Sequence, residues 1–299
     1  MKICACITLY HPNYEKLRRN LSQISSYCEK IYLLVNEKIA TFDNLYNDQI
    51  NDQIEVVLNQ KNIGLSAAFN IALKKALKEN FELAILFDQD SILSVENFKL
   101  MQNEFTILRS KYPVVCIGPS LRVYGNNLET PKWILSRKIV NIATVDSVKN
   151  IIISGMLLDI EAALSIGGFD TSFPVDFCDF FFCYKALSHG FYVLKSRDAF
   201  IQHEIGNSNM KIGKATIHFH APYRNYFLVR DTLRIVFSCK ETPFSVRLRY
   251  LFFLPLRMVL FIIMLDKKKE RLHMYYLGLK DFFQKKYGFG SVANLLEAN

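Results

Sequence analysis

Short apolar segments separated by polar turns dominate the first 90 residues. Three of them, Ile3–Leu9, Ile31–Val35 and Ile54–Leu58, have the length and the aliphatic composition of strands that are buried on both faces. A fourth, Leu83–Phe87, ends abruptly in the polar sequence Asp88-Gln89-Asp90-Ser91. This pattern is typical of a central strand that opens onto a polar site at its carboxyl end.

Between these strands, apolar residues recur every three or four positions, which predicts amphipathic helices. One helix follows Asn13, a plausible N-cap, and has apolar positions from Tyr14 to Cys28. Another covers residues 65–77, after the turn at Asn62-Ile63-Gly64. The alternation of strand and helix predicts an α/β fold with a right-handed, doubly wound parallel sheet, in which ligands bind at the carboxyl ends of the strands.

The rest of the chain divides into a less regular middle and a helical end. We expect strands at Val114–Gly118, Ile151–Leu158 and Phe191–Leu194, a short helix at Glu161–Ser165, and helices at Tyr223–Phe237 and Phe244–Leu265. Because the composition changes near residue 215, we predict a catalytic domain of residues 1–215 and a C-terminal helical appendage of residues 216–299.

The charge is distributed unevenly along the chain. Residues 1–204 carry 21 Lys and Arg against 22 Asp and Glu, whereas residues 205–299 carry 16 against 6. A basic C-terminal region indicates an anionic partner, either phospholipid or nucleic acid. Its cations alternate with Leu, Phe, Ile and Met rather than with a stacking surface, so we expect a membrane surface and no nucleic acid.

The apolar stretch Tyr250–Leu265 is about 16 residues long and contains Pro255 and Arg257, whereas a spanning helix needs roughly 20 apolar residues. Cations precede it, and Lys267-Lys268-Lys269 follows it. A helix lying in the membrane interface and a core helix packed on the catalytic domain both fit this pattern.

Several classes of site are disfavoured by the residues present. The seven cysteines are odd in number and include no C-x-x-C pair, which favours neither a disulfide framework nor a thiolate metal site. The six histidines lack an H-E-x-x-H pattern, and no serine lies in a G-x-S-x-G turn. The first ten residues lack a secretory cleavage pattern, so we expect a cytoplasmic protein.

Two carboxylate clusters could support chemistry. Asp88 and Asp90 could bind a hard divalent cation at the end of a buried strand, or they could belong to a solvated loop. Asp176 and Asp179 precede the aromatic run Phe180-Phe181-Phe182, whose apolar surroundings would raise a carboxyl pKa and suit a general base. The alternative is that one of these two aspartates caps a helix.

Taken together, these segments resemble the inverting glycosyltransferases of the large family 2 type, most closely the bacterial rhamnosyltransferase branch. Thr8-Leu9-Tyr10-His11-Pro12 resembles the opening T-Y-x-P turn, residues 59–70 resemble the N-x-G-x-A-x-A-x-N helix start, and Asp88-Gln89-Asp90-Ser91 matches D-Q-D-S. Later matches are Ser154-Gly155, Gly167–Asp170, Phe173–Asp179, His203–Gly206 (H-x-x-G), Arg230-Asp231, Leu277–Asp281 and Gly288.

The resemblance implies a GT-A fold, a nucleoside diphosphate sugar donor and an inverting transfer with Asp179 as catalytic base. It also implies Mg²⁺ or Mn²⁺ held by Asp88 and Asp90. Carried over residue by residue, the substrate-binding positions are Thr8, Tyr10, Asn36, Asn62, Gly64, Asn70, Asp88, Gly155, Asp176, His203 and Arg230.

This sequence departs from the family pattern at two places. Val35 stands where the family has an aspartate that contacts the donor base, so this contact falls to Asn36 or to the backbone. Phe181 and Lys185 replace an acidic residue and an arginine after Asp179, on the side of the acceptor.

The resemblance also implies substrates and a location. We expect dTDP-rhamnose as donor, with UDP-galactose or UDP-glucose as the alternative. We expect a polyprenyl-linked glycan of O-antigen or capsule synthesis as acceptor, and a peripheral position at the inner face of the cell membrane. A catalytically silent membrane-binding protein is the alternative from a different class, and a homo-oligomer is left open.

Overall fold

The computed structural model describes residues 1–37, 52–123, 126–127, 135, 144–203, 209–212, 215–218 and 221–297. Strands and helices alternate through its first part, as the apolar pattern predicts. This part contains β1 (Ile3–Leu9), α1 (Tyr14–Ile24), β2 (Lys30–Val35), β3 (Ile54–Leu58), α3 (Leu65–Lys78), β4 (Leu83–Asp88), β5 (Ser91–Leu93) and α4 (Val95–Arg109). Asn13 caps α1 as predicted, because its side chain accepts a hydrogen bond from the Lys16 N–H at 3.1 Å.

The middle of the chain completes the sheet, and the C-terminal part is helical. The middle comprises β6 (Val114–Val123), β7 (Asn126–Asn127), β8 (Val145–Ser147), β9 (Met156–Asp159), α5 (Ile160–Ser165), α6 (Cys178–Ser188), β10 (Tyr192–His203), β11 (Asn209–Ile212) and β12 (Ala215–His218). The C-terminal part comprises α7 (Arg224–Phe237), α8 (Phe244–Met264), α9 (Lys268–Phe283), a 3₁₀ turn (Gly290–Val292) and α10 (Ala293–Glu297). The boundary at residue 215 stays a prediction.

The main sheet has the strand order β3-β2-β1-β4-β9-β6-β10-β5. Its first four strands are parallel, which confirms the prediction for the first 90 residues. Beyond β4 the sheet is mixed, because β9 runs antiparallel to both β4 and β6 whereas β10 runs parallel to β6. The strand expected from Ile151 begins only at Met156, because Gly155 adopts a left-handed φ of 79°.

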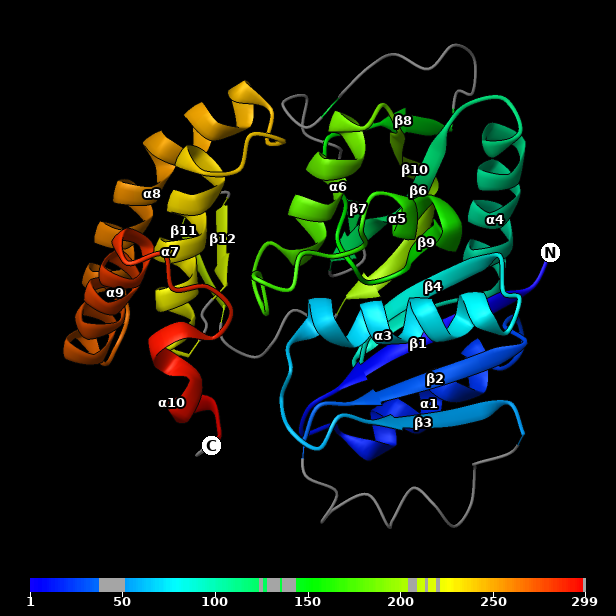
Figure 1. The fold of residues 1–299 in the computed structure, drawn as a ribbon, viewed down its shortest axis with the longest axis horizontal. Helices are drawn as coiled ribbons and strands as arrows, with labels where there is room; N and C mark the ends of the chain where they lie inside the picture. Colours follow the sequence, from blue (N-terminus) through cyan, green and yellow to red (C-terminus); the bar gives the residue numbers. More distant parts are fainter. Residues whose placement is uncertain are drawn as a thin grey trace.

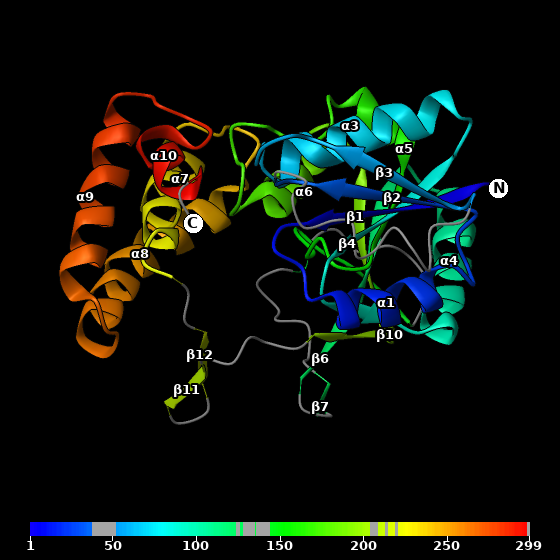
Figure 2. The ribbon, with the colours of Figure 1, turned by 90° about the horizontal axis from the view of Figure 1, so that it is seen from below.

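Two helical layers cover the sheet, with α1 and α4 on one face and α3, α5 and α6 on the other (Figures 1 and 2). Successive residues of β1 point to opposite faces, so Ala5 joins the core under α1 and α4 while Cys6 joins the core under α3. Both faces are therefore apolar, and every residue of β1 except Thr8 is apolar. Helix α4 was not expected from the sequence.

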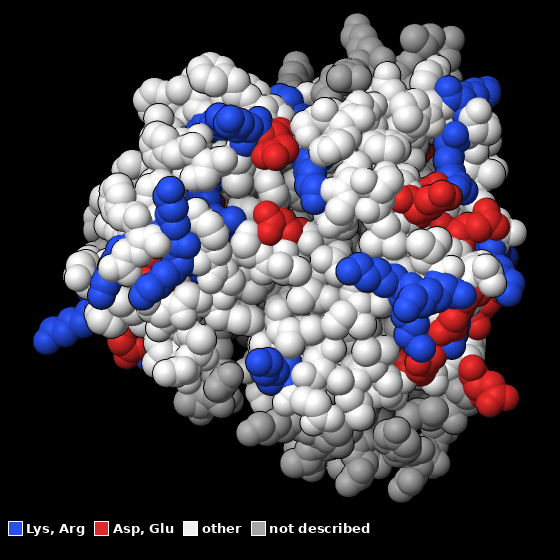
Figure 3. Space-filling view, in the orientation of Figure 1, with Lys and Arg blue, Asp and Glu red and all other residues white. Residues whose placement is uncertain are grey.

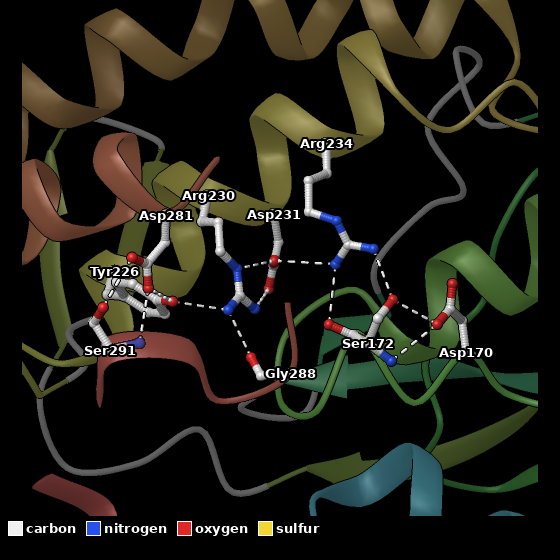
Figure 4. A network of polar contacts seen from close by, with 9 residues as sticks. All are labelled: Asp170, Ser172, Tyr226, Arg230, Asp231, Arg234, Asp281, Gly288 and Ser291. Carbon is white, nitrogen blue, oxygen red and sulfur yellow. Dashed lines mark hydrogen bonds and ion pairs between the residues drawn. The ribbon is translucent and has the colours of Figure 1, made fainter. Parts of the chain in front are cut away.

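Helix α7 is the centre of the C-terminal part, since both α8 and α9 pack against it. A network of buried charges ties α7 to the loop before α6 (Figure 4). The Arg234 guanidinium donates to the Ser172 carbonyl at 3.0 Å and to its hydroxyl oxygen at 2.6 Å, and Ser172 in turn donates to Asp170. Within the described residues, none of the helices has both the length and the hydropathy needed to cross a bilayer.

Candidate active site

The carboxyl ends of β1 and β4 lie side by side at one edge of the sheet. Thr8 stands opposite Asp88 in the parallel register. The turn after β4 is held in place through Gln89, whose side-chain oxygen accepts from the Tyr10 N–H at 2.9 Å and whose carbonyl accepts from the Asn20 amide at 3.2 Å. Thr8, Tyr10 and the Asp88–Asp90 turn are thus brought together, as the sequence predicts.

Two consecutive residues hold the Asp88 and Asp179 carboxylates. The Ser154 hydroxyl donates to Asp88 Oδ2 at 2.6 Å, and the Ile153 N–H donates to Asp179 Oδ2 at 3.2 Å. A side chain at Gly155 would place its Cβ 2.9 Å from Pro119 Cγ, so this close approach of the backbone requires glycine. Carboxylates about ninety positions apart in the sequence therefore face one site.

Burial raises the pKa of Asp179 to about 7, although hydrogen bonds from the backbone oppose this rise. The Phe180 N–H donates to Oδ1 at 2.8 Å, and the negative charge of Asp88 adds to the upward shift. A carboxyl group with a pKa near neutrality is half ionised under ordinary conditions. It can therefore accept a proton and release it again, which is what a general base must do.

Helix α6 begins at Cys178 after Phe177, so neither aspartate is its N-cap residue, although Asp179 accepts from the Phe180 N–H in the first turn. The preceding residue, Phe177, has a left-handed φ of 64°, which is a strained conformation for an aromatic residue. Its ring lies 6.4 Å from that of Phe180 and 5.3 Å from that of Tyr250 on α8. These rings form an apolar wall beside Asp179.

Asn36, a predicted substrate contact, binds neighbouring segments of the chain. Its side chain is buried, its Oδ1 accepts from the Asn59 amide at 2.9 Å, and its Nδ2 lies 3.5 Å from the Gly64 carbonyl. Asn36 therefore ties the ends of β2 and β3 to the start of α3.

The start of α3 lies close to the loop before α6. A Cβ at Gly64 would lie 2.7 Å from Pro174 Cβ, and the Gly64 N–H donates to Asn62 Oδ1 at 3.0 Å. Further along the helix, Asn70 both accepts from the Phe169 N–H at 2.9 Å and donates to its carbonyl at 2.7 Å. Asn70 thus fixes the loop, whereas Asn62 is partly exposed at the edge of the site.

The N-terminus of α7 supplies residues to the site that the sequence analysis missed. Arg224 forms an ion pair with Asp176, which was predicted to bind substrate. Burial raises the pKa of the Tyr10 phenol, with further contributions from Tyr223 and Glu37, which places Tyr10 near α7. Figure 3 shows acidic and basic side chains next to each other between the C-terminal helices and the sheet. No sequence motif marked Arg224.

Arg230 and His203 are the two remaining predicted substrate contacts. Arg230 is fully buried, pairs with Asp231 at 2.8 Å, and donates to the Gly288 carbonyl at 2.6 Å (Figure 4), so the structure gives it a structural role. The backbone of His203 ends β10, opposite Ser91 of β5, but its side chain lies outside the described residues.

The turn between β4 and β5 fits a hard divalent cation. Asp88 and Asp90 are both partly exposed there, and their carboxylate oxygens are the donors that Mg²⁺ and Mn²⁺ prefer. Among the residues that the structure describes, no three His, Cys, Asp or Glu side chains gather closely enough to hold a metal by themselves. A site of two carboxylates suits a cation that also binds substrate phosphate.

Comparison with known proteins agrees with this fold. No protein-family model matches the chain. The chain is 24% identical to the dTDP-rhamnosyl transferase RfbF of Shigella flexneri over 298 residues, which cover 93% of this chain and 94% of that relative.

Among solved structures, the chain is similar to TarS of S. aureus (residues 1–349) in complex with UDP-GlcNAc, with a TM-score of 0.59 and 14% identity over 95% of this chain and 81% of TarS 1–349. The chain has the GT-A glycosyltransferase fold. GalNAc-T7 with UDP, GalNAc and Mn²⁺ is also similar, with a TM-score of 0.55 and 15% identity over 87% of this chain. The chain spans just over half of GalNAc-T7, 56% of its length. Over almost its whole length, the chain also resembles the rhamnosyltransferase branch that its motifs indicate.

Proposed function

We propose that this protein is an inverting glycosyltransferase that moves a sugar from a nucleoside diphosphate donor to an acceptor hydroxyl. The proposal is carried by one observation: Ile153 and Ser154 hold the Asp179 and Asp88 carboxylates at the carboxyl edge of a GT-A sheet. Asp88 is on the side of the sheet where donors of such folds bind, and Asp179 lies beside the aromatic wall that faces the C-terminal helices.

Asp179 acts as the base in a single displacement. The acceptor oxygen forms a bond to the anomeric carbon as the bond from that carbon to the diphosphate oxygen breaks, and the acceptor proton passes to an Asp179 oxygen. Attack from the face opposite the leaving group inverts the anomeric configuration. Mg²⁺ or Mn²⁺ held by Asp88 and Asp90 would neutralise negative charge on the leaving diphosphate.

For the donor we favour dTDP-rhamnose, because the curated relative is named as a dTDP-rhamnosyl transferase and is matched over 94% of its length. UDP-galactose or UDP-glucose is the second candidate, because the similar TarS and GalNAc-T7 structures hold UDP. Thymine and uracil differ only in the C5 methyl group, so hydrogen bonds to the base from Asn36 or from the backbone would accept both candidates.

Titration calorimetry with these three nucleotide sugars in the presence of Mn²⁺ tests the proposed function. We expect dTDP-rhamnose to bind most tightly. In a separate assay of sugar transfer, EDTA should lower the rate by about 100-fold or more, because a metal supplies several kcal/mol of charge stabilisation. Asp90→Ala should weaken Mn²⁺-dependent binding, whereas Asp266→Ala, an exposed aspartate on the α8–α9 turn, should not. Absence of binding by all three donors would contradict the proposal.

The pH dependence of turnover follows from the raised pKa of Asp179. Since the base must be ionised, kcat should fall about tenfold per pH unit well below pH 7 and should reach a plateau above about pH 8. Initial rates at saturating donor and acceptor between pH 5 and pH 9 measure this profile. A flat profile down to pH 5 would show that the ionising group is not Asp179.

The acceptor that we propose is a polyprenyl-linked glycan of bacterial surface polysaccharide synthesis, O-antigen or capsule, presented at the inner face of the cell membrane. Support comes from the basic C-terminal region, residues 205–299, which carries 16 Lys and Arg and only 6 Asp and Glu. Such an acceptor combines a lipid, which stays in the bilayer, with a sugar that must reach Asp179.

A further inference from the structure

Helix α8 exposes an apolar row. Although it has 21 residues, only Val246, Leu254 and Phe261 are buried. On the opposite side, large apolar residues recur every three or four positions and are exposed by 44% to 78%: Phe244, Leu248, Leu251, Phe252, Leu256, Val259 and Ile263. A row of this length is unusual on a protein surface that meets only water. The structure thus shows that the core-helix interpretation accounts for only one side of α8.

Helix α9 carries a second row of the same kind. Leu272, Tyr276, Leu279 and Phe283 are exposed at intervals of four, three and four residues. The other side of α9 packs on α7, where Gly278 permits contact so close that a Cβ would lie 2.7 Å from the Tyr226 carbonyl oxygen. Figures 1 and 2 place α8 and α9 next to each other at the end of the molecule farthest from the sheet.

Positive charge borders these rows. Arg247 and Arg249 lie in the first turns of α8, and residues 242–265 contain no Asp or Glu. The exposed Lys267, Lys268 and Lys269 lie where α8 turns into α9, between Asp266 and Glu270, so this end keeps a net positive charge. Apolar rows bordered by Lys and Arg are the composition of helices that lie in the interface of an anionic bilayer.

A second copy of the chain fits this surface poorly. In a two-fold symmetric contact between two α8 helices, either end of one helix meets an end that is also positive, because Arg247 and Arg249 mark one end and Lys267–Lys269 the other. Such a contact would bring like charges together. An anionic lipid surface attracts both ends at once.

The inner side of α8 contributes to the candidate active site. The ring of Tyr250 lies 5.3 Å from the ring of Phe177, and Phe177 precedes Asp179 by two residues. Tyr250 is on the same side of α8 as the buried Val246 and Leu254. The outer apolar row and the catalytic carboxylate are therefore on opposite sides of one helix, whose diameter is about 10 Å.

We propose that the outer rows of α8 and α9 form a membrane-binding face that docks on an anionic bilayer. Docking there holds the site around Asp179 about one helix diameter from the lipid. The binding claim is independent of the transfer reaction, whereas its use for presenting a lipid-linked acceptor rests on the proposed function.

Co-sedimentation of the full chain with vesicles tests the proposal. We expect binding to phosphatidylglycerol-containing vesicles that weakens with salt and is much weaker on pure phosphatidylcholine. Phe252→Glu with Val259→Glu should lower the partition coefficient by about 100-fold or more, since two apolar side chains that would enter the bilayer are replaced by charged ones. Lys267, Lys268 and Lys269 all changed to Gln should lower it by about 100-fold. Leu100→Glu with Ile107→Glu, at exposed apolar positions on α4, is the matched control and should bind like the parent.

Each result bears on the proposal. Loss of binding in the α8 variant but not in the α4 control supports it, provided that both retain the parental thermal midpoint. No sedimentation of the parent with any vesicle overturns it. So does a parent that is a dimer by analytical ultracentrifugation, that becomes monomeric in the α8 variant and that ignores vesicles. Calorimetry with the nucleotide sugars is unaffected by either failure, so the proposed function is judged separately.

Discussion

Replacing Asp179 with asparagine should lower the transfer rate by about 10²- to 10⁴-fold while leaving donor affinity within about twofold. Asparagine keeps the shape of the side chain and an oxygen that can accept from the Phe180 N–H, but it cannot take up the acceptor proton. Single-turnover rates measure the first effect, and calorimetry with dTDP-rhamnose and Mn²⁺ measures the second.

Asp146→Asn is the matched control, because it makes the same chemical change in the ion pair with Arg197, away from the site. It should leave the rate unchanged. Burial raises the pKa of Asp179 in the folded state, so ionisation of this group costs stability as the pH rises through 7. The thermal midpoint of Asp179→Asn at pH 8 should therefore be no lower than that of the parent. Turnover by this variant at the parental rate would mean that another group is the base.

Replacing Arg230 with alanine should lower the free energy of unfolding by about 3 to 5 kcal/mol at pH 8, because it removes the partner that binds both oxygens of the buried Asp231 carboxylate and leaves only Arg234, 3.6 Å from Oδ1. Arg230 donates to both oxygens of Asp231, at 2.8 and 3.1 Å, and both side chains are completely buried. It also binds the Gly288 carbonyl and the Tyr226 hydroxyl, so the C-terminal segment loses an anchor as well. Urea unfolding measures the loss.

The loss should be smaller at pH 5 than at pH 8. Burial raises the pKa of Asp231 to about 6 even with Arg230 in place, and removal of Arg230 raises it further. At pH 5 the carboxyl of the variant is therefore protonated and neutral, and no unpaired charge is buried. Arg197→Ala, which breaks an exposed pair, should cost at most about 1 kcal/mol. If Arg230→Ala kept its stability and instead raised the KM for donor or acceptor, Arg230 would be the substrate contact that the sequence indicated.

The sequence predicted the parallel half of the sheet well, because strands buried on both faces are continuous apolar runs. Ile3–Leu9 and Ile54–Leu58 match the structure at both ends. Helix α4 was missed although its buried apolar residues, such as Phe98, Met101 and Phe105, recur at the same helical spacing that predicted the other helices. The orientation of β9 could not be read from its composition, since direction depends on which strands it pairs with.

The site was predictable where a motif coincides with the end of a strand, as at Asp88. It was not predictable where a residue type that binds substrates, such as asparagine, also connects segments of the fold. Asn36 and Asn70 match family positions, yet the side-chain amides of both form hydrogen bonds with other segments of the chain. Arg224 and Tyr250 reach the site only because α7 and α8 fold back onto α6, and no local pattern encodes such a contact.

A crystal structure of the protein with dTDP-rhamnose and Mn²⁺ tests the central claim most directly, with anomalous scattering used to locate the metal. We predict a manganese peak at Asp88 and Asp90, the diphosphate beside it, and the anomeric carbon between that metal and Asp179. A nucleotide bound at another surface, or a sugar that Asp179 cannot approach on the face opposite the diphosphate, would contradict the account.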